Sequence, residues 1–597
     1  MTYTPLQLKQ NPLSQKATSF MAVKGENRRD LPQLLDPSFA LKIKNFIIYG
    51  QGGLLKRRGL AKIEEVAGAN AIQFLEVFDE DTLVYAYADK VAAYNFSSDT
   101  STVINTYAAT STIYSGDRYG GYFFITNGKT NVARISRTLA YDAQSANFTV
   151  GKILTGTTSG ATATILQDSD SGATGTLTLG YIDGVFLDNE PITDSAGGAA
   201  VANGTINWVF TSISGSPICK VLKAIGPRLY AGNLDSDETA VWYSNTDTGT
   251  NPPFSTWTPG TNAADPGTLY FRNAGPVNDI EAFGQNIIVV GSEFGKWAFN
   301  TTTIDSAGTL KKVDNIFMQK IDAGVKKFLY SESGLYFVNK VGLWKMLSLG
   351  QLNVPFSEQE QEVSVLLGNN YFEDFDFSKA DIVDDMKRKL IMVTCSKDSE
   401  VNNHVLVYHT EFNAFTYFDG WNISQFTTIN GVIYASSAVS TKLYEVFGSQ
   451  SDDGNDIWCE FYQELKMGGL ETLNTITKFY AQGYLSSSSN VAIEWDIYDQ
   501  EGNFVYNKST WEWTVSSNSN LSDGFGVASW GTSSWGGDVD VSTVSESFSG
   551  CAVRIANFQR IRIRIKEHSK LPLIINWFSA EGRTKMPARR RNILKIS

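Results

Sequence analysis

The sequence predicts an all-β protein: a β-propeller of about six or seven blades with an inserted small β-domain and a C-terminal β-sandwich-like domain. Composition is the first reason, because 51 glycines and 15 prolines accompany 42% hydrophobic, 12% aromatic and only 19% charged residues. This balance is typical of turn-rich β proteins. The second reason is that short runs of β-branched and aromatic residues, separated by tight polar turns, recur along the chain.

The clearest of these repeats lies in Ile72–Phe96, which reads as three apolar runs separated by acidic turns. The pattern predicts an antiparallel meander of three strands. A lone meander buries too little apolar surface to be stable, so it needs copies of itself or a partner sheet. Similar units follow at intervals of roughly 40–50 residues, which is the period of propeller blades. The Trp-Asp and Gly-His marks of WD40 repeats are missing.

Changes in amino-acid composition and in the pattern of apolar runs predict five regions along the chain. In order these are an extended N-terminal arm (1–44), the first blades (45–146), an inserted small barrel or sandwich (147–210), the remaining blades (211–450) and a C-terminal sandwich or platform domain with a basic tail (451–597). The arm carries four prolines, and we expect either a frayed terminus or an arm that orders against a neighbouring subunit. The insert is rich in Thr, Gly and small residues, which suits a compact β-module.

Two local signals sharpen this outline. Asn127-Gly128 stands between two apolar runs and predicts a hairpin turn, although Gly128–Thr130 also invites a phosphate-loop reading that its spacing does not support. A short helix is expected near Glu358–Leu367. No apolar run reaches the roughly 18 residues of a membrane-spanning helix, and the N-terminus has no signal-peptide pattern, so we expect synthesis in a cytoplasm.

Basic residues gather in three places that are candidate contacts with another subunit or with DNA in a channel. The residues are Lys56, Arg57 and Arg58 after a glycine-rich turn, Arg560, Arg562, Arg564 and Lys566 on one face of a period-2 strand, and Arg589, Arg590 and Arg591 in the tail. The first trio is equally well explained as a solvated strand edge. The basic face of the strand could meet DNA, an acidic partner surface or water.

Charge and cysteine content exclude some classes of function. The net charge of −12 argues against tight, sequence-independent binding of nucleic acid, which needs a surplus of Lys and Arg. It leaves room for a surface that DNA slides past. Four scattered cysteines are too few for a disulfide framework and lack a metal-binding spacing, so we expect free thiols.

No catalytic or metal site can be assembled from the sequence. His404 and His409 are five residues apart in an expected strand and point to opposite faces, which excludes a shared metal. The acidic turn Asp452–Asp456 lacks the distal Glu of a calcium loop. Asn245–Gly249 with Trp257 is a weak cue for a glycan-binding propeller. We therefore expect no enzyme, no cofactor and no metal.

In the order of its regions of different composition, the chain resembles the tail nozzle proteins of short-tailed bacteriophages. These are also called packaged-DNA stabilisation proteins and are similar in role to tail tubular protein B. Four segments carry the likeness: Asn45–Leu60, Ile225–Asp247, Asn278–Phe299 followed by Ile321–Val325, and the closing strands from Arg560 to Arg583. A fifth likeness, to a small β-module that recurs in phage virion proteins, lies in the insert.

The resemblance implies a structural virion protein. It would form a homohexameric ring at the distal end of the tail, dock on a ring-shaped adaptor protein, retain packaged DNA and conduct it during ejection without sequence-specific binding. Tail fibres or spikes, and the host surface at the tip, are further expected partners, and the expected location is the virion tail. Two alternatives remain open: a glycan-binding or glycan-hydrolysing propeller, and a receptor-binding or fibre-attachment protein that uses the insert.

Overall fold

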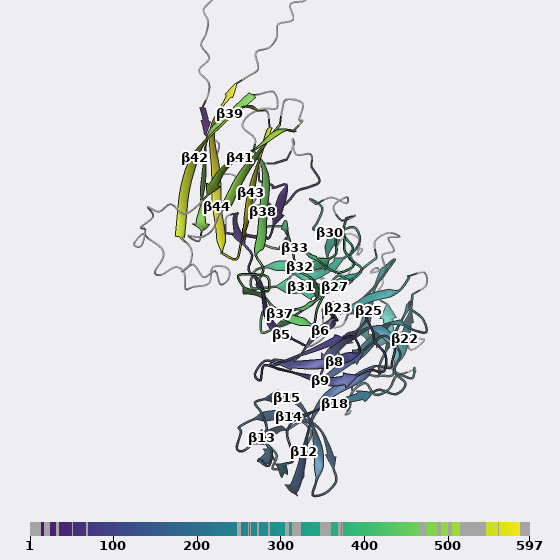
Figure 1. Ribbon diagram of the computed structural model, residues 1–597. Coiled ribbons are helices and arrows are strands. Elements are labelled where there is room, and N and C mark those ends of the chain that lie inside the picture. Colours follow the sequence, from purple (N-terminus) through teal and green to yellow (C-terminus); the bar gives the residue numbers. More distant parts are fainter. Residues whose placement is uncertain are drawn as a thin grey trace, which may run out of the picture.

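The chain is all-β, and the described residues contain strands β1 to β44 without a regular helix among them. This computed structural model describes residues 14–585, with internal gaps of which the longest are 17–23, 313–323, 347–359 and 514–544. Among these residues no helix is long and apolar enough to cross a membrane. Figure 1 shows three parts in a row: a pair of long sheets, a body of short sheets and a small domain at the far end.

The body consists of seven antiparallel units of four strands each, which we call the seven sheets: five are separate sheets, and two are four-stranded parts of nine-stranded sheets. Six of them follow the chain: β6 (Ile72–Asp79), β7 (Thr82–Tyr87), β8 (Lys90–Asn95) and β9 (Thr100–Thr106); β10 (Ser115–Tyr119), β11 (Tyr122–Thr126), β12 (Ala133–Ala146) and β18 (Asn207–Ser212); β19 (Cys219–Ile225), β20 (Arg228–Leu234), β21 (Ala240–Tyr243) and β22 (Gly267–Tyr270); β23 (Val277–Ala282), β24 (Ile287–Ser292), β25 (Lys296–Ile304) and β26 (Leu310–Lys312); β27 (Lys327–Ser331), β28 (Gly334–Val338), β29 (Leu343–Met346) and β30 (Glu360–Glu362); and β31 (Ile382–Asp385), β32 (Leu390–Cys395), β33 (His404–His409) and β34 (Ala414–Asp419).

The seventh sheet joins distant parts of the chain. Its strands are β35 (Ile423–Ile429), β36 (Val432–Ser437), β37 (Lys442–Ser449) and β5 (Gly59–Glu65), so a strand from the start of the chain completes a sheet near residue 450. The first strands of the seven sheets contact one another in order, and β35 then contacts β6. Hydrophobic clusters fill the spaces between successive sheets, as where Phe74, Phe78 and Val84 pack on Phe123 and Ile125.

The small domain at the far end grows out of the second sheet. β12 runs from this sheet into the domain, where it pairs with β15 (Gly175–Asp183) and with β17 (Ala199–Ala202). The remaining strands are β13 (Ile153–Gly156), β14 (Thr162–Asp170) and β16 (Pro191–Asp194), and they link β15 to β17. Residues 207–210 lie in β18 and pair with β12 in the body. The domain has its own core, which includes Leu139, Phe148 and Phe186.

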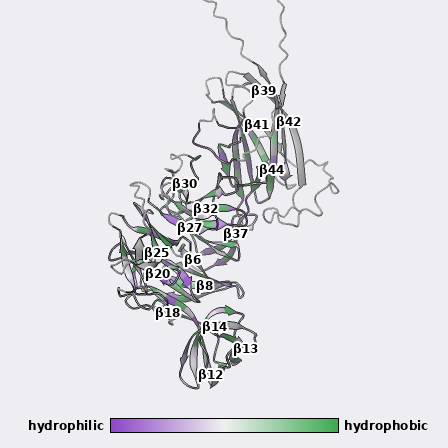
Figure 2. Ribbon diagram, turned by 180° about the vertical axis from the view of Figure 1, so that it is seen from behind, coloured by the Kyte–Doolittle hydropathy of each residue, from purple (hydrophilic) through white to green (hydrophobic). Residues whose placement is uncertain are grey.

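The C-terminal part is built from two sheets that share one core. One sheet has β3 (Phe46–Tyr49), β4 (Gly53–Lys56), β44 (Leu573–Lys585), β39 (Leu473–Leu485) and β42 (Ser545–Phe558), with β1 (Ser14–Lys16) beside β44. The other has β2 (Lys42–Lys44), β38 (Ile457–Leu465), β43 (Arg560–Ser569), β40 (Val491–Tyr498) and β41 (Phe504–Trp513). Phe479, Trp495 and Phe578 lie in the shared core, and Figure 2 shows hydrophobic and hydrophilic residues interleaved along the strands.

A single sheet connects this C-terminal part to the body. β2 pairs in parallel with β34 at Lys44 and Tyr417, and antiparallel with β38, so nine strands from β31 to β41 form one continuous sheet. Part of the predicted N-terminal arm therefore pairs with its own chain. Glu26 and Asn27 are also buried, and the backbone of Glu26 forms an isolated parallel β-bridge with that of Ala40.

Several local expectations are confirmed and one is wrong. The meander at 72–96 forms β6, β7 and β8, and Gly128 has a positive φ of 67° in the predicted hairpin turn. The short helix expected near Glu358–Leu367 is not formed in the described part, where residues 360–362 are a strand and 363–367 are turns. Here the backbone pairs with β29, and this pairing takes the hydrogen bonds that a helix would use.

Candidate functional site

The first strands of the seven sheets surround a cavity of about 710 Å³. Every one of these strands or the residues just before it contributes to the lining, including Glu76, Ser115, Lys223, Asp279 and Asp381. Because the chain enters each first strand at the same end, residues early in these strands lie together.

Charged side chains link neighbouring first strands around this cavity. The Lys223 ammonium lies 3.8 Å from Asp117 on one side and 3.3 Å from Glu281 on the other. Lys327 Nζ lies 3.4 Å from Asp279. Each pair joins two adjacent sheets, so the cavity wall is held by ion pairs as well as by apolar packing.

Carboxylate and amide oxygens add hydrogen bonds between sheets that share no ladder. The main-chain N–H of Phe328 donates to Asp279 at 2.8 Å, and that of Phe426 donates to Asp381 at 2.7 Å. In the same way the N–H of Leu75 donates to the Gln425 side chain at 2.8 Å. Separate sheets leave first-strand N–H groups without ladder partners, and buried N–H groups need partners. These side chains supply them.

Burial shifts the titration of several of these groups. It raises the pKa of Glu76 and of Asp381 above the usual carboxyl range, because the charged form loses water. Burial alone would lower the pKa of Lys223, but the carboxylates of Glu281 and Asp117 outweigh it and hold that pKa well above its ordinary value. Lys223 therefore stays charged.

The first predicted basic trio lies at the junction between the body and the C-terminal part. Lys56 is buried, with Nζ 2.5 Å from the Glu567 carboxylate, and it donates to the Ser569 carbonyl at 2.7 Å. Its side chain is 2% exposed. Arg58 is half-buried and its Nη2 is 3.4 Å from the Gly448 carbonyl. Lys56 thus acts within the chain.

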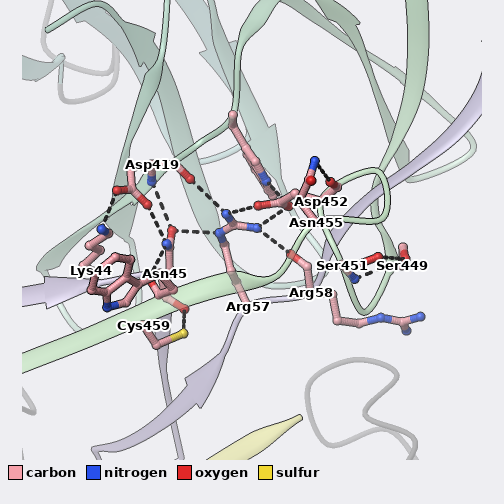
Figure 3. Close-up of polar contacts among 12 residues, drawn as sticks. Lys44, Asn45, Arg57, Arg58, Asp419, Ser449, Ser451, Asp452, Asn455 and Cys459 are labelled. Carbon is pink, nitrogen blue, oxygen red and sulfur yellow. Dashed lines mark hydrogen bonds and ion pairs between the residues drawn. The ribbon is translucent and has the colours of Figure 1, made fainter. Parts of the chain in front are cut away.

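Arg57 is the centre of the junction (Figure 3). Its guanidinium donates to both oxygens of Asp452, at 2.7 and 2.6 Å, and its Nε donates to Asn45 at 2.9 Å. It also donates to the Asp419 carbonyl at 3.0 Å and lies 4.5 Å from the Trp421 ring. Beside it, Lys44 and Asp419 form an ion pair at 2.6 Å. One planar cation thereby ties together strands from three distant parts of the chain.

The predicted basic strand is β43, and its isoleucines are buried while Arg562, Arg564 and Lys566 are half-buried on the other face. The basic face meets acidic residues of its own sheet. Register places Arg564 beside Glu494 of β40, and Lys566 beside Glu460 of β38. Arg564 forms an ion pair with Asp496, and Lys566 Nζ lies 2.9 Å from Glu494. Arg564 and Lys566 are thus paired with carboxylates of their own chain.

The other candidates are placed as follows. Arg560 begins β43 opposite Tyr498, and Arg589, Arg590 and Arg591 lie outside the described residues. Trp257, the glycan cue, is 3% exposed in a hydrophobic cluster, and Asp247 accepts a hydrogen bond from the Tyr119 hydroxyl at 3.0 Å.

No cluster suited to a metal ion occurs among the residues that the structure describes. The thiols of Cys219, Cys395 and Cys459 are free and buried, as expected.

The sequence alone did not predict the charged residues of the first strands that surround the cavity. These residues are visible in the sequence, because charged side chains lie within or just before the first strands at Asp117, Lys223, Asp279, Lys327 and Asp381. Each isolated charge is unremarkable by itself. Only the strand order brings them to one place.

No protein-family model matches the chain, and no curated protein matches it. Two structures described as the extracellular domain of BT4673 from B. thetaiotaomicron are 10% identical, with TM-scores of 0.37 and 0.38 over 65% of this chain. The match spans only 40% and 39% of those chains. Hsv2 from Kluyveromyces lactis is 9% identical with a TM-score of 0.27, over 58% of this chain and 97% of that one. At TM-scores this low, none of these likenesses bears on fold or function.

Proposed function

We propose that the seven short sheets form a seven-bladed β-propeller, with the insert as a small barrel on its second blade and the C-terminal sheets as a sandwich. The contacts of the seven first strands in ring order, with β35 returning to β6, support this arrangement. So does β5, which completes the last blade from the start of the chain. A ring closed in this way has few free sheet edges.

The protein is, in our proposal, a structural virion protein: the subunit of a homohexameric tail nozzle that closes the channel of a short-tailed phage. The proposal comes from the sequence resemblance, and one structural observation favours it. The continuous sheet from β31 to β41, together with the Arg57–Asp452 pair, joins the body to the C-terminal part through backbone and side-chain hydrogen bonds, which favours a rigid subunit. Rigid subunits suit a ring whose shape must hold against packaged DNA.

The DNA path would lie between subunits of the ring. The cavity within one chain has about 710 Å³, which is the size of a small-molecule site. A DNA duplex, whose major groove alone is about 12 Å wide, does not fit there. The charge balance on the outer face of β43 agrees with a surface that does not grip phosphates.

The test is the assembly state, alone and with the ring-shaped adaptor protein. Size-exclusion chromatography with light scattering should give about six times the 65.7 kDa mass of one chain, and micrographs of particles should show six-fold density at the tail tip. A protein that stays monomeric with and without the adaptor, and is absent from particles, would contradict the proposal.

A second candidate function is receptor or fibre attachment through the insert, and the position of the insert favours it. The insert lies at the end of the molecule opposite the C-terminal sheets (Figure 1). It also exposes apolar side chains, with Ile153 54% and Val185 67% exposed. Exposed apolar residues that gather on one module mark interaction sites.

Deletion of the insert tests this second function. Thr138 and Asn207 are paired neighbours on β12 and β18, so an Asn-Gly turn can replace residues 139–206 without breaking the second sheet. Particles with the deletion should assemble and fail to adsorb. Normal adsorption would assign the insert another role, and failed assembly would place it in the ring.

A further inference from the structure

The mouth of the central cavity is basic, although the whole chain carries a net charge of −12. Lys220, Lys326 and Lys379 line the cavity at the end where the chain enters the first strands of three different sheets. Lys220 and Lys326 are half-buried, and Lys379 is exposed. Three lysines from three different sheets thus line one cavity.

These lysines differ from the two that lie farther along the same strands. Lys223 and Lys327 are each paired with carboxylates of a neighbouring sheet. By contrast, Lys220 and Lys326 have no ion pair with any residue that the structure describes, and Lys379 donates to the neutral carbonyl of Glu400 at 2.7 Å. The three lysines at the mouth therefore have no direct carboxylate partner among the described residues, although Glu76, Asp279 and Asp381 line the same cavity.

An ammonium group that has no carboxylate partner and lies in a concave, partly desolvated site interacts favourably with an anion. Its hydration is already reduced, and the low local dielectric strengthens attraction to an incoming negative charge. The paired residues along the wall hold the lysine-bearing strands in place before any ligand arrives, which reduces the ordering cost of binding. The volume of about 710 Å³ also lies in the range of small-molecule sites.

We propose that this cavity binds a small anion with two or more negative charges, carried by carboxylate or phosphate groups, which contact Lys220 and Lys326 at the mouth. A single site on each chain is expected. The inference does not depend on the nozzle proposal, because it concerns a cavity within one chain and is tested on binding alone.

The experiment is titration calorimetry with citrate and, separately, with inorganic pyrophosphate, at matched ionic strength. The double variant Lys220→Gln, Lys326→Gln keeps the side-chain length and removes both charges. Lys152→Gln, Lys570→Gln is the matched control, because both lysines are exposed elsewhere and the net charge changes equally. We expect wild type and control to bind one anion per chain, and the Lys220, Lys326 variant to lose at least about ten-fold in affinity.

Stronger binding of citrate or of pyrophosphate identifies which anionic group the mouth prefers, and either result supports the site. Equal binding by all three proteins would overturn the proposal. So would the absence of saturable binding of either anion to wild type at anion concentrations up to about 10 mM. Circular dichroism of the variants confirms that a loss of affinity does not reflect unfolding.

Discussion

Arg57 and Asp452 form a bidentate pair across the junction of body and C-terminal part, in which Nη1 donates to one carboxylate oxygen and Nη2 donates to the other. Among the basic side chains, arginine is the one that binds a carboxylate in this planar, bidentate way, because lysine offers only a point charge. The pair is buried on the arginine side, where the side chain is 0% exposed, and 13% exposed on the aspartate side.

Loss of this pair should destabilise the whole protein. We expect Arg57→Met to lower the free energy of unfolding by about 3–5 kcal/mol, because it removes the cation that pairs with the Asp452 carboxylate and one of the donors to the Asn45 amide oxygen. Denaturant unfolding measures this. Lys24→Ala is the control, since Lys24 pairs with Asp36 at 55% exposure on both sides and should cost under about 1 kcal/mol. Equal effects of the two changes would contradict the assignment.

Gly59, where β5 begins, has no room for a side chain. A Cβ there would lie 2.1 Å from the main-chain oxygen of Ser451, so the backbone must move. We expect Gly59→Ala to lower the free energy of unfolding by about 1–3 kcal/mol. Lys62→Ala, on an exposed position of the same strand, should change it by less than about 0.5 kcal/mol. Thermal unfolding distinguishes these outcomes.

His409 should make the protein acid-sensitive. Burial lowers the pKa of His409 to about 3, while its Nε2 lies 3.0 Å from the Thr416 hydroxyl. The folded pKa is below the unfolded value, so as pH falls below about 6.5 the unfolded state binds the proton first and the folded state loses stability. The loss should approach about 1.4 kcal/mol per pH unit between pH 6 and pH 4.

The measurement compares the pH slope of unfolding free energy in wild type and in His409→Gln. Glu76 and Asp381, whose pKa values are raised, add stability on protonation, whereas Glu190, whose pKa is lowered, loses it. The difference between variants is therefore the quantity to read. The slope should flatten in His409→Gln and remain in His568→Gln, where the histidine is 59% exposed. Identical slopes in all three proteins would refute this role.

Glu190 should hold the loops of the insert. Its carboxylate accepts main-chain hydrogen bonds from Thr158, Ser159 and Leu187. Burial alone would raise the pKa of Glu190, but these bonds outweigh it and lower that pKa. We expect Glu190→Gln to destabilise the insert by about 1–3 kcal/mol, because an amide nitrogen would face N–H donors.

Limited proteolysis provides the readout for this variant. Cleavage should appear within residues 147–206 while the body stays intact, since the insert has a separate core. Asp183→Asn, at an exposed site in the same module, should leave the cleavage pattern unchanged. Cleavage spread over the body instead would show that the two cores unfold together.

Local patterns predicted strands well, because side-chain alternation and turn residues act over short stretches. The meander at 72–96, the hairpin at Asn127-Gly128 and the buried isoleucines of Ile561–Ile565 follow from such patterns. The expected helix near Glu358–Leu367 failed because tertiary pairing with β29 overrides weak local preference.

Local sequence patterns could not predict which strands pair with one another. Alternation places Arg562 and Arg564 on one face, yet it does not reveal that β38 and β40 bring carboxylates to that face. Likewise nothing near Lys220 or Lys326 in the sequence indicates that their strands open onto one cavity. Such facts arise from pairing across hundreds of residues.

The closing strand β5 has a consequence for how the protein is made. Ser449 of β37 pairs with Gly59 of β5, so a segment that leaves the ribosome early waits until roughly 380 further residues have been added. At about 5–20 residues per second, that delay is on the order of 20–80 seconds. During this time β5 is an unpaired strand. Nascent chains should therefore depend on holding chaperones, and a circular permutant that begins near residue 70, in which β5 is made last and β37 already exists, should lose that dependence.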